Sequence, residues 1–265
     1  MLLKIGVFDS GLGGLTVAHA MTKVIKGADI FYIADTKNAP YGEKTPEQIL
    51  QFSLNITKYL IDTHNIDALI LACNTATSAA IEKLREVYPS LIIIGTEPGI
   101  KPAIEQTKTG KIGVLATPAT LQGNKYQKLV NTLSLDKSIA MYEQACYGLV
   151  EQIEKGETNS MQTNAMLEKW LAPMREANVD TIVLGCTHYP LISQNIEHIM
   201  GQTVKLVHTG DAISRHLLAL SSKKGHKNEG DLYMHIYVTG KINMHMVSSI
   251  IDTYESICFI EIENN

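Results

Sequence analysis

Residues 67–75 read DALILACNT, and residues 180–188 read DTIVLGCTH, so the second stretch repeats the first position for position. In each copy an acidic residue opens an apolar run, which ends in a small residue, a cysteine and a polar residue. Such a run is typical of a strand buried in a parallel sheet. Each cysteine therefore falls at the carboxyl end of a strand, the edge at which open α/β sheets bind their ligands.

A second pair of stretches supports a duplication. Residues 4–10 read KIGVFDS and residues 111–117 read KIGVLAT, in the same order along the chain and at nearly the same separation. The separation is about the length of a domain and far longer than the repeat of a solenoid. We therefore expect two related halves, which are residues 1–97 with 209–265 and residues 98–208.

Strand candidates alternate with helical patterns, which predicts parallel sheets covered by helices. The strand candidates are residues 3–8, 30–34, 68–71, 91–94, 112–115, 139–141, 181–184 and 204–206. The clearest helices span 47–61, with a capping box formed by Thr45 and Gln48 at its start, and 165–176. The tail, residues 231–263, is expected to add two strands around a short helix to the first half. The predicted fold class is thus α/β, with two pseudo-symmetric open domains and mainly parallel sheets.

The composition excludes several classes of protein. The chain has 265 residues, a hydrophobic fraction of 45% and a formal net charge of −4, without a basic cluster that would bind nucleic acid. No apolar stretch approaches the roughly 18 residues of a membrane span. The first residues lack the pattern of a signal peptide. We therefore expect a cytoplasmic protein that binds neither nucleic acid nor membrane.

The four cysteines lack the spacing of a zinc site, and in a reducing compartment we expect free thiols. For Cys146 and Cys258 we expect the ordinary role of a small buried hydrophobic residue. The repeat and the adjacent polar residues favour a chemical role for Cys73 and Cys186. Each thiol is expected at the N-terminus of a helix, where the helix dipole lowers the pKa of a thiol.

Two residues are candidates to help the thiols. His188 follows Cys186 by two positions and could hold or supply a proton there. Asp9 ends the first strand candidate, and the pseudo-symmetry makes it a plausible partner of Cys73.

The glycine-rich stretch after that strand, residues 9–14 (DSGLGG), is not a nucleotide fingerprint, because Thr16 occupies the position of the third glycine. Its N–H groups suit a small anion such as a carboxylate, although the stretch could also be a tight turn alone.

Six segments together resemble glutamate racemases, which belong to the cofactor-independent aspartate/glutamate racemase family. The segments are residues 8–17 (FDSGLGGLTV), 40–42 (PYG), 72–77 (ACNTAT), 97–103 (EPGIKPA), 116–120 (ATPAT) and 185–191 (GCTHYPL). The resemblance extends from residue 5 to about residue 215. It departs from the family pattern at residues 208–212 (HTGDA), and the chain beyond about residue 220 carries little family signal.

The resemblance implies an active site at the interface of the two halves, without a cofactor or a metal. Cys73 and Cys186 would be the two acid/bases, Asp9 and His188 would tune their protonation, and Glu151 would support the histidine. The residues expected to hold the carboxylates and the ammonium group of the substrate are Ser10, Tyr41, Gly42, Asn74, Thr75, Thr117, Thr120 and Thr187. The family also implies a homodimer that supplies D-glutamate for peptidoglycan.

Other functions stay open at this stage. An aspartate racemase or a malonate decarboxylase would use the same fold with different pocket residues, although a decarboxylase needs only one thiol. A non-catalytic amino-acid-binding or regulatory protein would keep the pocket but has no use for paired thiols. A cysteine hydrolase is a weaker alternative, because it also needs a single thiol.

Overall fold

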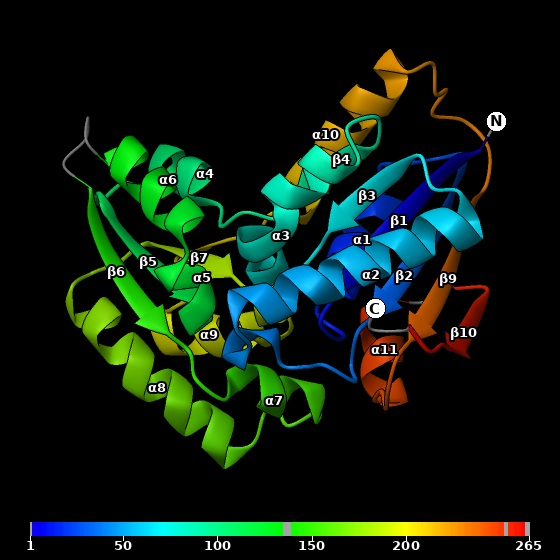
Figure 1. Ribbon diagram of the computed structural model, residues 1–265. Helices are drawn as coiled ribbons and strands as arrows, with labels where there is room; N and C mark the ends of the chain where they lie inside the picture. The colour runs from blue at the N-terminus through cyan, green and yellow to red at the C-terminus, as the bar shows by residue number, and fades with distance from the viewer. Residues whose placement is uncertain (1, 135–138, 252–253, 263–265) are drawn as a thin grey trace. The chain divides into compact units, whose positions relative to one another are not determined.

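The computed structural model describes residues 2–134, 139–251 and 254–262. The chain divides into two compact units, which are unit 1 (Met1–Thr96 with Thr209–Asn265) and unit 2 (Glu97–His208). Each unit is built around one parallel sheet with helices packed against it (Figure 1). The predicted α/β class with parallel sheets is confirmed.

Unit 1 contains a six-stranded parallel sheet with the strand order β10-β9-β2-β1-β3-β4. Its strands are β1 (Leu3–Asp9), β2 (Ala28–Ala34), β3 (Ala68–Leu71), β4 (Ile92–Gly95), β9 (Leu232–Val238) and β10 (Ser256–Phe259). Its helices are α1 (Leu15–Thr22), α2 (Pro46–His64), α3 (Asn74–Val87), α10 (Gly210–Lys223) and α11 (Met244–Ile250). The helices α2 and α3 pack together over one core cluster, and α1 packs against α10 and α11 (Figure 1).

Unit 2 contains a four-stranded parallel sheet with the order β6-β5-β7-β8. Its strands are β5 (Lys111–Ala116), β6 (Ala140–Ala145), β7 (Thr181–Gly185) and β8 (Lys205–Val207). Its helices are α4 (Ile100–Gln106), α5 (Pro118–Gln122), α6 (Asn124–Ser134), α7 (Leu149–Glu154), α8 (Met161–Glu176) and α9 (Ser193–Met200). Residues of α4 and α6 share a core cluster with Val114 and Val183, while Met174 of α8 lies against Gly113.

The two sheets confirm the internal duplication. The core order β2-β1-β3-β4 of unit 1 is repeated by β6-β5-β7-β8 of unit 2. Phe8 pairs with Leu71 in unit 1, and the residues at the same positions of the repeat, Leu115 and Leu184, pair in unit 2. The register of the central strand pair is therefore the same in both units.

Most of the predicted elements are found with ends shifted by one or a few residues. The capping box of α2 is present, since Thr45 Oγ1 accepts the N–H of Gln48 and Gln48 Oε1 accepts that of Thr45. The tail adds β9 and β10 to the sheet of unit 1, as expected.

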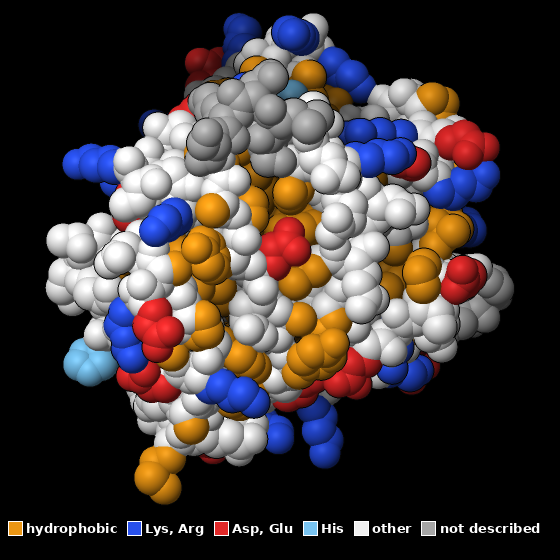
Figure 2. Space-filling model, turned by 90° about the vertical axis from the view of Figure 1, so that its left-hand side faces the viewer, with side chains coloured by type: hydrophobic (Ala, Val, Ile, Leu, Met, Phe, Trp, Pro, Cys, Tyr) orange, Lys and Arg blue, Asp and Glu red, His pale blue; other side chains and the backbone are white. Residues whose placement is uncertain are grey.

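The strand β6 continues to Ala145, beyond the predicted end at Met141. The strand β6 lies at the edge of its sheet, and none of its residues is fully buried. Its second half therefore contains polar residues, and the apolar run that predicts a strand ends early. Figure 2 shows the face on which β6 and α6 lie, with hydrophobic side chains gathered between charged ones.

Within the described residues, no helix is long and apolar enough to cross a membrane.

The acidic residue that opens each repeat binds the amino-terminal edge of its sheet. Asp180 Oδ1 accepts the hydroxyl of Thr107 (2.6 Å), and Oδ2 accepts the N–H groups of Lys108 (2.7 Å) and Thr109 (3.0 Å). Burial by itself raises the pKa of Asp180, but these hydrogen bonds outweigh it and lower the pKa to about 2. In unit 1, Asp67 Oδ2 accepts the N–H of Lys4 (2.9 Å).

We predict that Asp180→Asn destabilises unit 2 by about 1 kcal/mol at neutral pH, because the hydrogen bonds lose their charged acceptor in a partly exposed site. The folded-state pKa lies below the ordinary value of 3.8, so the carboxylate stabilises the fold above that value. Its contribution disappears as the pH falls toward about 2, and the difference between variant and wild type should shrink in that range.

The measurement is urea unfolding followed by the fluorescence of Trp170, the single tryptophan, which lies in α8 of unit 2. Asp67→Asn is the matched control, because among the described residues its carboxyl accepts one N–H, that of Lys4, and it lies in unit 1. An Asp180→Asn effect that did not change with pH would contradict the assignment of the stabilisation to the charge.

Candidate active site

The predicted site residues of unit 1 lie at the carboxyl edge of its sheet, where open α/β sheets bind ligands. Asp9 ends β1, Ser10 follows it, and Cys73 follows β3. The N–H of Ala72 donates to the carbonyl of Phe8 (2.9 Å), so the two chain segments leave the sheet side by side.

Cys73 is held at the N-terminus of α3. Its Sγ accepts the N–H of Ala76 (3.4 Å) and lies 3.8 Å from Ser10 Oγ, with 6% of the residue exposed. The expected position at a helix N-terminus is confirmed for this thiol. The helix dipole and the N–H donors there favour a thiolate.

Asp9 is fully buried within the glycine-rich turn. Its Oδ1 accepts the N–H of Gly11 (2.8 Å). A Cβ on Gly14 would lie 2.5 Å from Asp9 Cβ and 2.8 Å from Tyr32 Oη, so only glycine fits there. The turn therefore binds a carboxylate of the protein itself, and its glycines allow close packing around Asp9.

Tyr41 and Gly42 lie in a short 3-10 helix, η1 (Tyr41–Glu43), which precedes α2. Burial, followed by the charge of Asp35 and the more distant charges of Cys73 and Asp9, raises the pKa of the Tyr41 phenol. Tyr41 Oη donates to Asp35 Oδ2 (2.6 Å).

Asn74 presents an unusual polar group beside Cys73. Its Oδ1 is buried, and among the described residues it has no hydrogen-bond partner. A buried amide oxygen without a partner costs free energy, and a bound water or a ligand that donates to it would remove this cost. An ammonium group is a donor of the required kind.

The corresponding edge of unit 2 carries Thr117 and Cys186, which follow the paired residues Ala116 and Gly185. Thr117 caps α5, where its Oγ1 accepts the N–H of Thr120 (3.2 Å) and lies 2.9 Å from Thr120 Oγ1. Cys186 is 7% exposed, and the adjacent Thr187 is 6% exposed.

The expected helix N-terminus at Cys186 is wrong in detail. A turn follows this cysteine, and the next helix is the 3-10 helix η2 (Tyr189–Ile192), with α9 beginning only at Ser193. The proline at position 190 tightens this segment, because it fixes φ and removes an N–H donor. The electrostatic support of Cys186 must therefore come mainly from side chains.

That support is His188. Its Nδ1 lies 3.7 Å from Cys186 Sγ, and its Nε2 lies 2.6 Å from Glu154 Oε1. The imidazole is 2% exposed. Burial lowers the pKa of His188, but the combined effects of Cys186 and Glu154 outweigh it and raise the pKa well above its ordinary value. The histidine can thus hold a proton between a thiol and a carboxylate.

The carboxylate that contacts His188 Nε2 is that of Glu154, whereas the resemblance implies this support from Glu151. Glu151 and Glu154 lie three positions apart on α7 and therefore face the same side of the helix. The spacing of residues in the sequence does not show which of the two contacts His188. Glu151 instead adds negative charge near the phenol of Tyr189.

The other two cysteines differ from each other. Cys146 is buried, and burial raises the pKa of its thiol to about 12, which fits the expected inert role. Cys258 is exposed, on the edge strand β10, so the expectation of a buried residue was wrong there. Edge strands leave side chains in solvent that a central strand would bury.

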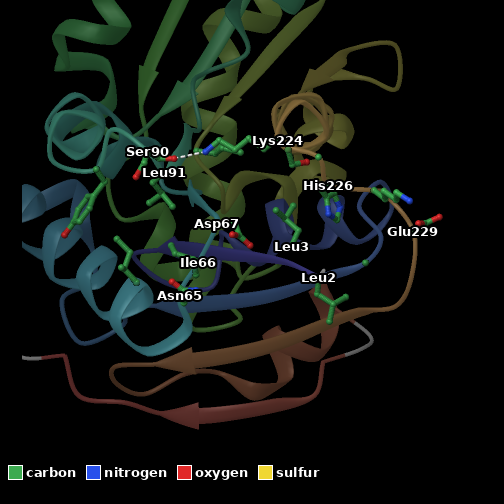
Figure 3. A pocket seen from close by; sticks show the side chains of 17 residues that line it. Leu2, Leu3, Asn65, Ile66, Asp67, Ser90, Leu91, Lys224, His226 and Glu229 are labelled. Carbon is green, nitrogen blue, oxygen red and sulfur yellow. Dashed lines mark hydrogen bonds between the residues drawn. The ribbon is translucent and has the colours of Figure 1, made fainter.

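A cavity of about 1060 Å³ in unit 1 lies at the amino ends of the strands, away from the edge that carries Cys73 (Figure 3). Lys224 reaches across it to donate to the carbonyl of Ser90 (2.7 Å). None of the predicted site residues lines this cavity. The chemistry of the side chains, and not the size of a cavity, identifies the site. The described part of the chain contains no group of three metal-ligating side chains placed to hold a metal ion.

Equivalent strands of the two duplicated α/β units each lead into a buried cysteine, Cys73 after β3 and Cys186 after β7. The family model of Asp/Glu/hydantoin racemases matches residues 5–217. The glutamate racemase of Sulfurovum sp. is 64% identical over 263 residues, which cover 99% of both chains. The chain therefore belongs to the Asp/Glu/hydantoin racemase family, in its glutamate racemase group, and is an amino-acid racemase.

Solved structures agree with this assignment. The glutamate racemase isoform RacE1 of Bacillus anthracis superposes with a TM-score of 0.86 at 30% identity, covering 98% of this chain and 97% of its own. The glutamate racemase of Francisella tularensis, solved in complex with D-glutamate, gives a TM-score of 0.85 at 28% identity and covers 99% of both chains.

We predict that Glu154→Gln moves the alkaline limb of the pH–rate profile to lower pH. Loss of the carboxylate charge removes one of the causes that raise the pKa of His188, so the imidazole loses its proton at a lower pH. The measurement is kcat and KM across the alkaline range. Glu151→Gln is the matched control on the same helix and should leave the limb in place. The opposite pattern, with the shift in Glu151→Gln alone, would contradict the contact.

Proposed function

We propose that this chain interconverts L-glutamate and D-glutamate by a two-base mechanism in which Cys73 and Cys186 are the acid/bases, one from each unit. The observation that carries the proposal is the identical register of the strand pairs that end in the two thiols. The two products of such a reaction are mirror images, so its equilibrium constant is one. Two near-equivalent groups of opposite protonation state are what this chemistry requires.

In the proposed reaction, a thiolate removes the α-proton on one face of glutamate, and a thiol delivers a proton to the opposite face. On one face the Cα–H bond breaks and an S–H bond forms on the thiolate. On the opposite face the S–H bond of the thiol breaks and a new Cα–H bond forms. Reversal of the reaction exchanges the two protonation states. By resemblance to the family, Cys73 acts on D-glutamate and Cys186 on L-glutamate.

The two thiols have different helpers in this proposal. Asp9 lies beside the N-terminus of α3 and takes part in proton exchange with Cys73. His188, held by Glu154, keeps a proton next to Cys186 and stabilises its thiolate. The raised pKa of His188 supports a protonated imidazole at neutral pH.

The α-proton of an amino acid is very weakly acidic, so the site must stabilise the negative charge that develops. We assign this task, and the binding of the carboxylates and the ammonium group, to the polar groups at the two sheet edges. Asn74 Oδ1 supplies an acceptor without a partner among the described residues. The remaining binding residues of the proposal are Ser10, Tyr41, Gly42, Thr75, Thr117, Thr120 and Thr187.

Glutamate is favoured over aspartate as the substrate, because the relative with 64% identity is a glutamate racemase. The D-glutamate bound to the Francisella tularensis racemase supports the same choice. A non-catalytic amino-acid-binding protein would have no need of two duplicated thiols. We further propose a cytoplasmic homodimer that supplies D-glutamate for peptidoglycan, as in the family.

We predict that Cys73→Ser and Cys186→Ser each lower racemisation by about 10³-fold or more, because serine is too weak an acid to replace a catalytic thiol. Binding of glutamate should change little, since oxygen and sulfur occupy similar space. The measurements are optical rotation and α-deuterium uptake in D₂O, with binding followed by calorimetry.

Cys146→Ser is the matched control, since this thiol is also buried but is held unreactive by its raised pKa. It should keep both binding and racemisation. Wild-type protein that binds glutamate without racemising or exchanging it would overturn the proposed reaction. Racemisation of aspartate alone would move the assignment to the aspartate enzymes.

A further inference from the structure

A buried carboxyl group that the mechanism does not use lies next to the site of unit 1. Asp35 follows β2 and is 2% exposed. Its backbone N–H donates to the carbonyl of Asp9 (2.9 Å), so it stands beside the end of β1. A buried carboxylate is costly unless its oxygens accept hydrogen bonds.

Both oxygens of Asp35 are satisfied by neutral donors. Tyr41 Oη donates to Oδ2 (2.6 Å), Thr239 Oγ1 donates to Oδ1 (2.7 Å), and Asn38 Nδ2 contacts both oxygens (3.1 and 3.0 Å). The network therefore joins the end of β2, the loop that leads to η1, and the residue that follows β9. Hydrogen bonds to an ionised acceptor are stronger than neutral ones and fix geometry more tightly.

This network decides what Tyr41 can offer to a substrate. The phenol is buried, and its proton is committed to Asp35, so it cannot donate to a carboxylate of the substrate. The backbone N–H groups of Tyr41 and Gly42 are not held in this way, because within the described ranges no acceptor outside their own short helix contacts them. Adjacent N–H groups of this kind form a site for an anion. What Tyr41 contributes through its side chain is the position of these two amides.

The C-terminal segment holds the other side of the same loop. Thr239 donates its N–H to the carbonyl of Ala34 (3.1 Å) and accepts the N–H of Lys37 (3.1 Å). A Cβ on Gly240 would lie 2.9 Å from the nitrogen of Lys37, so the two backbones run in close contact. The segment after β9 is thereby tied to the loop between β2 and η1.

We infer that Asp35 and Thr239 are positioning residues, which hold the Tyr41 side chain so that the Tyr41 and Gly42 amides face the substrate. The inference rests on the proposed function and adds to it the role of the C-terminal segment in substrate binding. Asp35 and Thr239 act through Tyr41 and do not take part in proton transfer. Their loss should weaken binding more than it slows the chemical step.

The test uses the full-length protein and three substitutions, which are Asp35→Asn, Thr239→Val and Tyr41→Phe. Each removes one member of the network with little change in volume. We expect KM for both enantiomers to rise about tenfold while kcat changes by less than about threefold, since uniform binding is lost. The dissociation constant of D-glutamate, measured by calorimetry, should rise by the same factor as KM. Because the equilibrium constant is one, kcat/KM must fall equally in the two directions.

Two further variants separate positioning from general stability. Thr239→Ser keeps the hydroxyl and should restore KM to the wild-type value. The double variant Tyr41→Phe with Asp35→Asn should raise KM by less than the product of the two single effects, because both changes act on the same hydrogen bond from Tyr41 Oη to Asp35 Oδ2. Asp29→Asn, in the strand β2 that precedes Asp35 and outside the network, is the control for loss of a carboxylate.

If Asp35→Asn fails to fold, Thr239→Val and Thr239→Ser still decide the question. Unchanged KM in Thr239→Val and Tyr41→Phe, with an active wild type, would overturn the inference and leave the proposed function intact. A fall in kcat alone, or additive effects in the double variant, would also overturn it. Wild-type protein that does not racemise glutamate would instead remove the proposed function on which the inference rests.

Discussion

The parallel pairing of two central strands is the constraint on which the rest of this structure depends. Because β1 pairs with β3 and β5 with β7 in one register, the residues that follow paired strands emerge together at the carboxyl edge. At this edge Cys73 Sγ lies 3.8 Å from Ser10 Oγ in unit 1. In unit 2, Cys186 follows β7, and Thr117 follows β5, the strand that pairs with β7. A shift of either strand by one residue would reverse its side chains and remove the thiol from this edge. The duplication therefore conserves a register, and the chemistry follows from it.

The halves have diverged in how they support the thiol. Unit 1 places Cys73 at the N-terminus of α3 and surrounds Asp9 with glycines, so that backbone dipoles and a buried carboxylate act on the site. In unit 2 the turn after Cys186 leads into a 3-10 helix, and the ion pair of His188 and Glu154 is present instead. In the proposed reaction the two thiols exchange protonation states, and the two units would support them through different surroundings. Equivalence of function does not require equivalence of side chains.

The features that could be predicted from the sequence are those that neighbouring residues encode. Buried strands, the capping box of α2 and the repeated cysteines are encoded by neighbouring residues, so the fold class and the equivalent positions of the two cysteines after their strands could be predicted. The partner of His188 could not, because Glu151 and Glu154 lie on one side of α7 and only the placement of η2 selects between them. The exposure of Cys258 depended on β10 being an edge strand, which pattern alone does not reveal. Asp35 and Thr239 are distant in sequence, and only the pairing of β2 with β9 brings them together.

In the inferred arrangement, recognition through backbone amides lets a segment with little family signal contribute to the site. An N–H group carries no side-chain identity, so its position is set by the hydrogen bonds and packing of the loop that holds it. In unit 1 that loop is held by Asp35 on one side and by the segment after β9 on the other. Many different sequences can build a strand that pairs with β2, provided that a hydroxyl reaches Asp35. The tail can therefore vary in sequence while its contribution to substrate binding, as inferred here, is preserved through geometry.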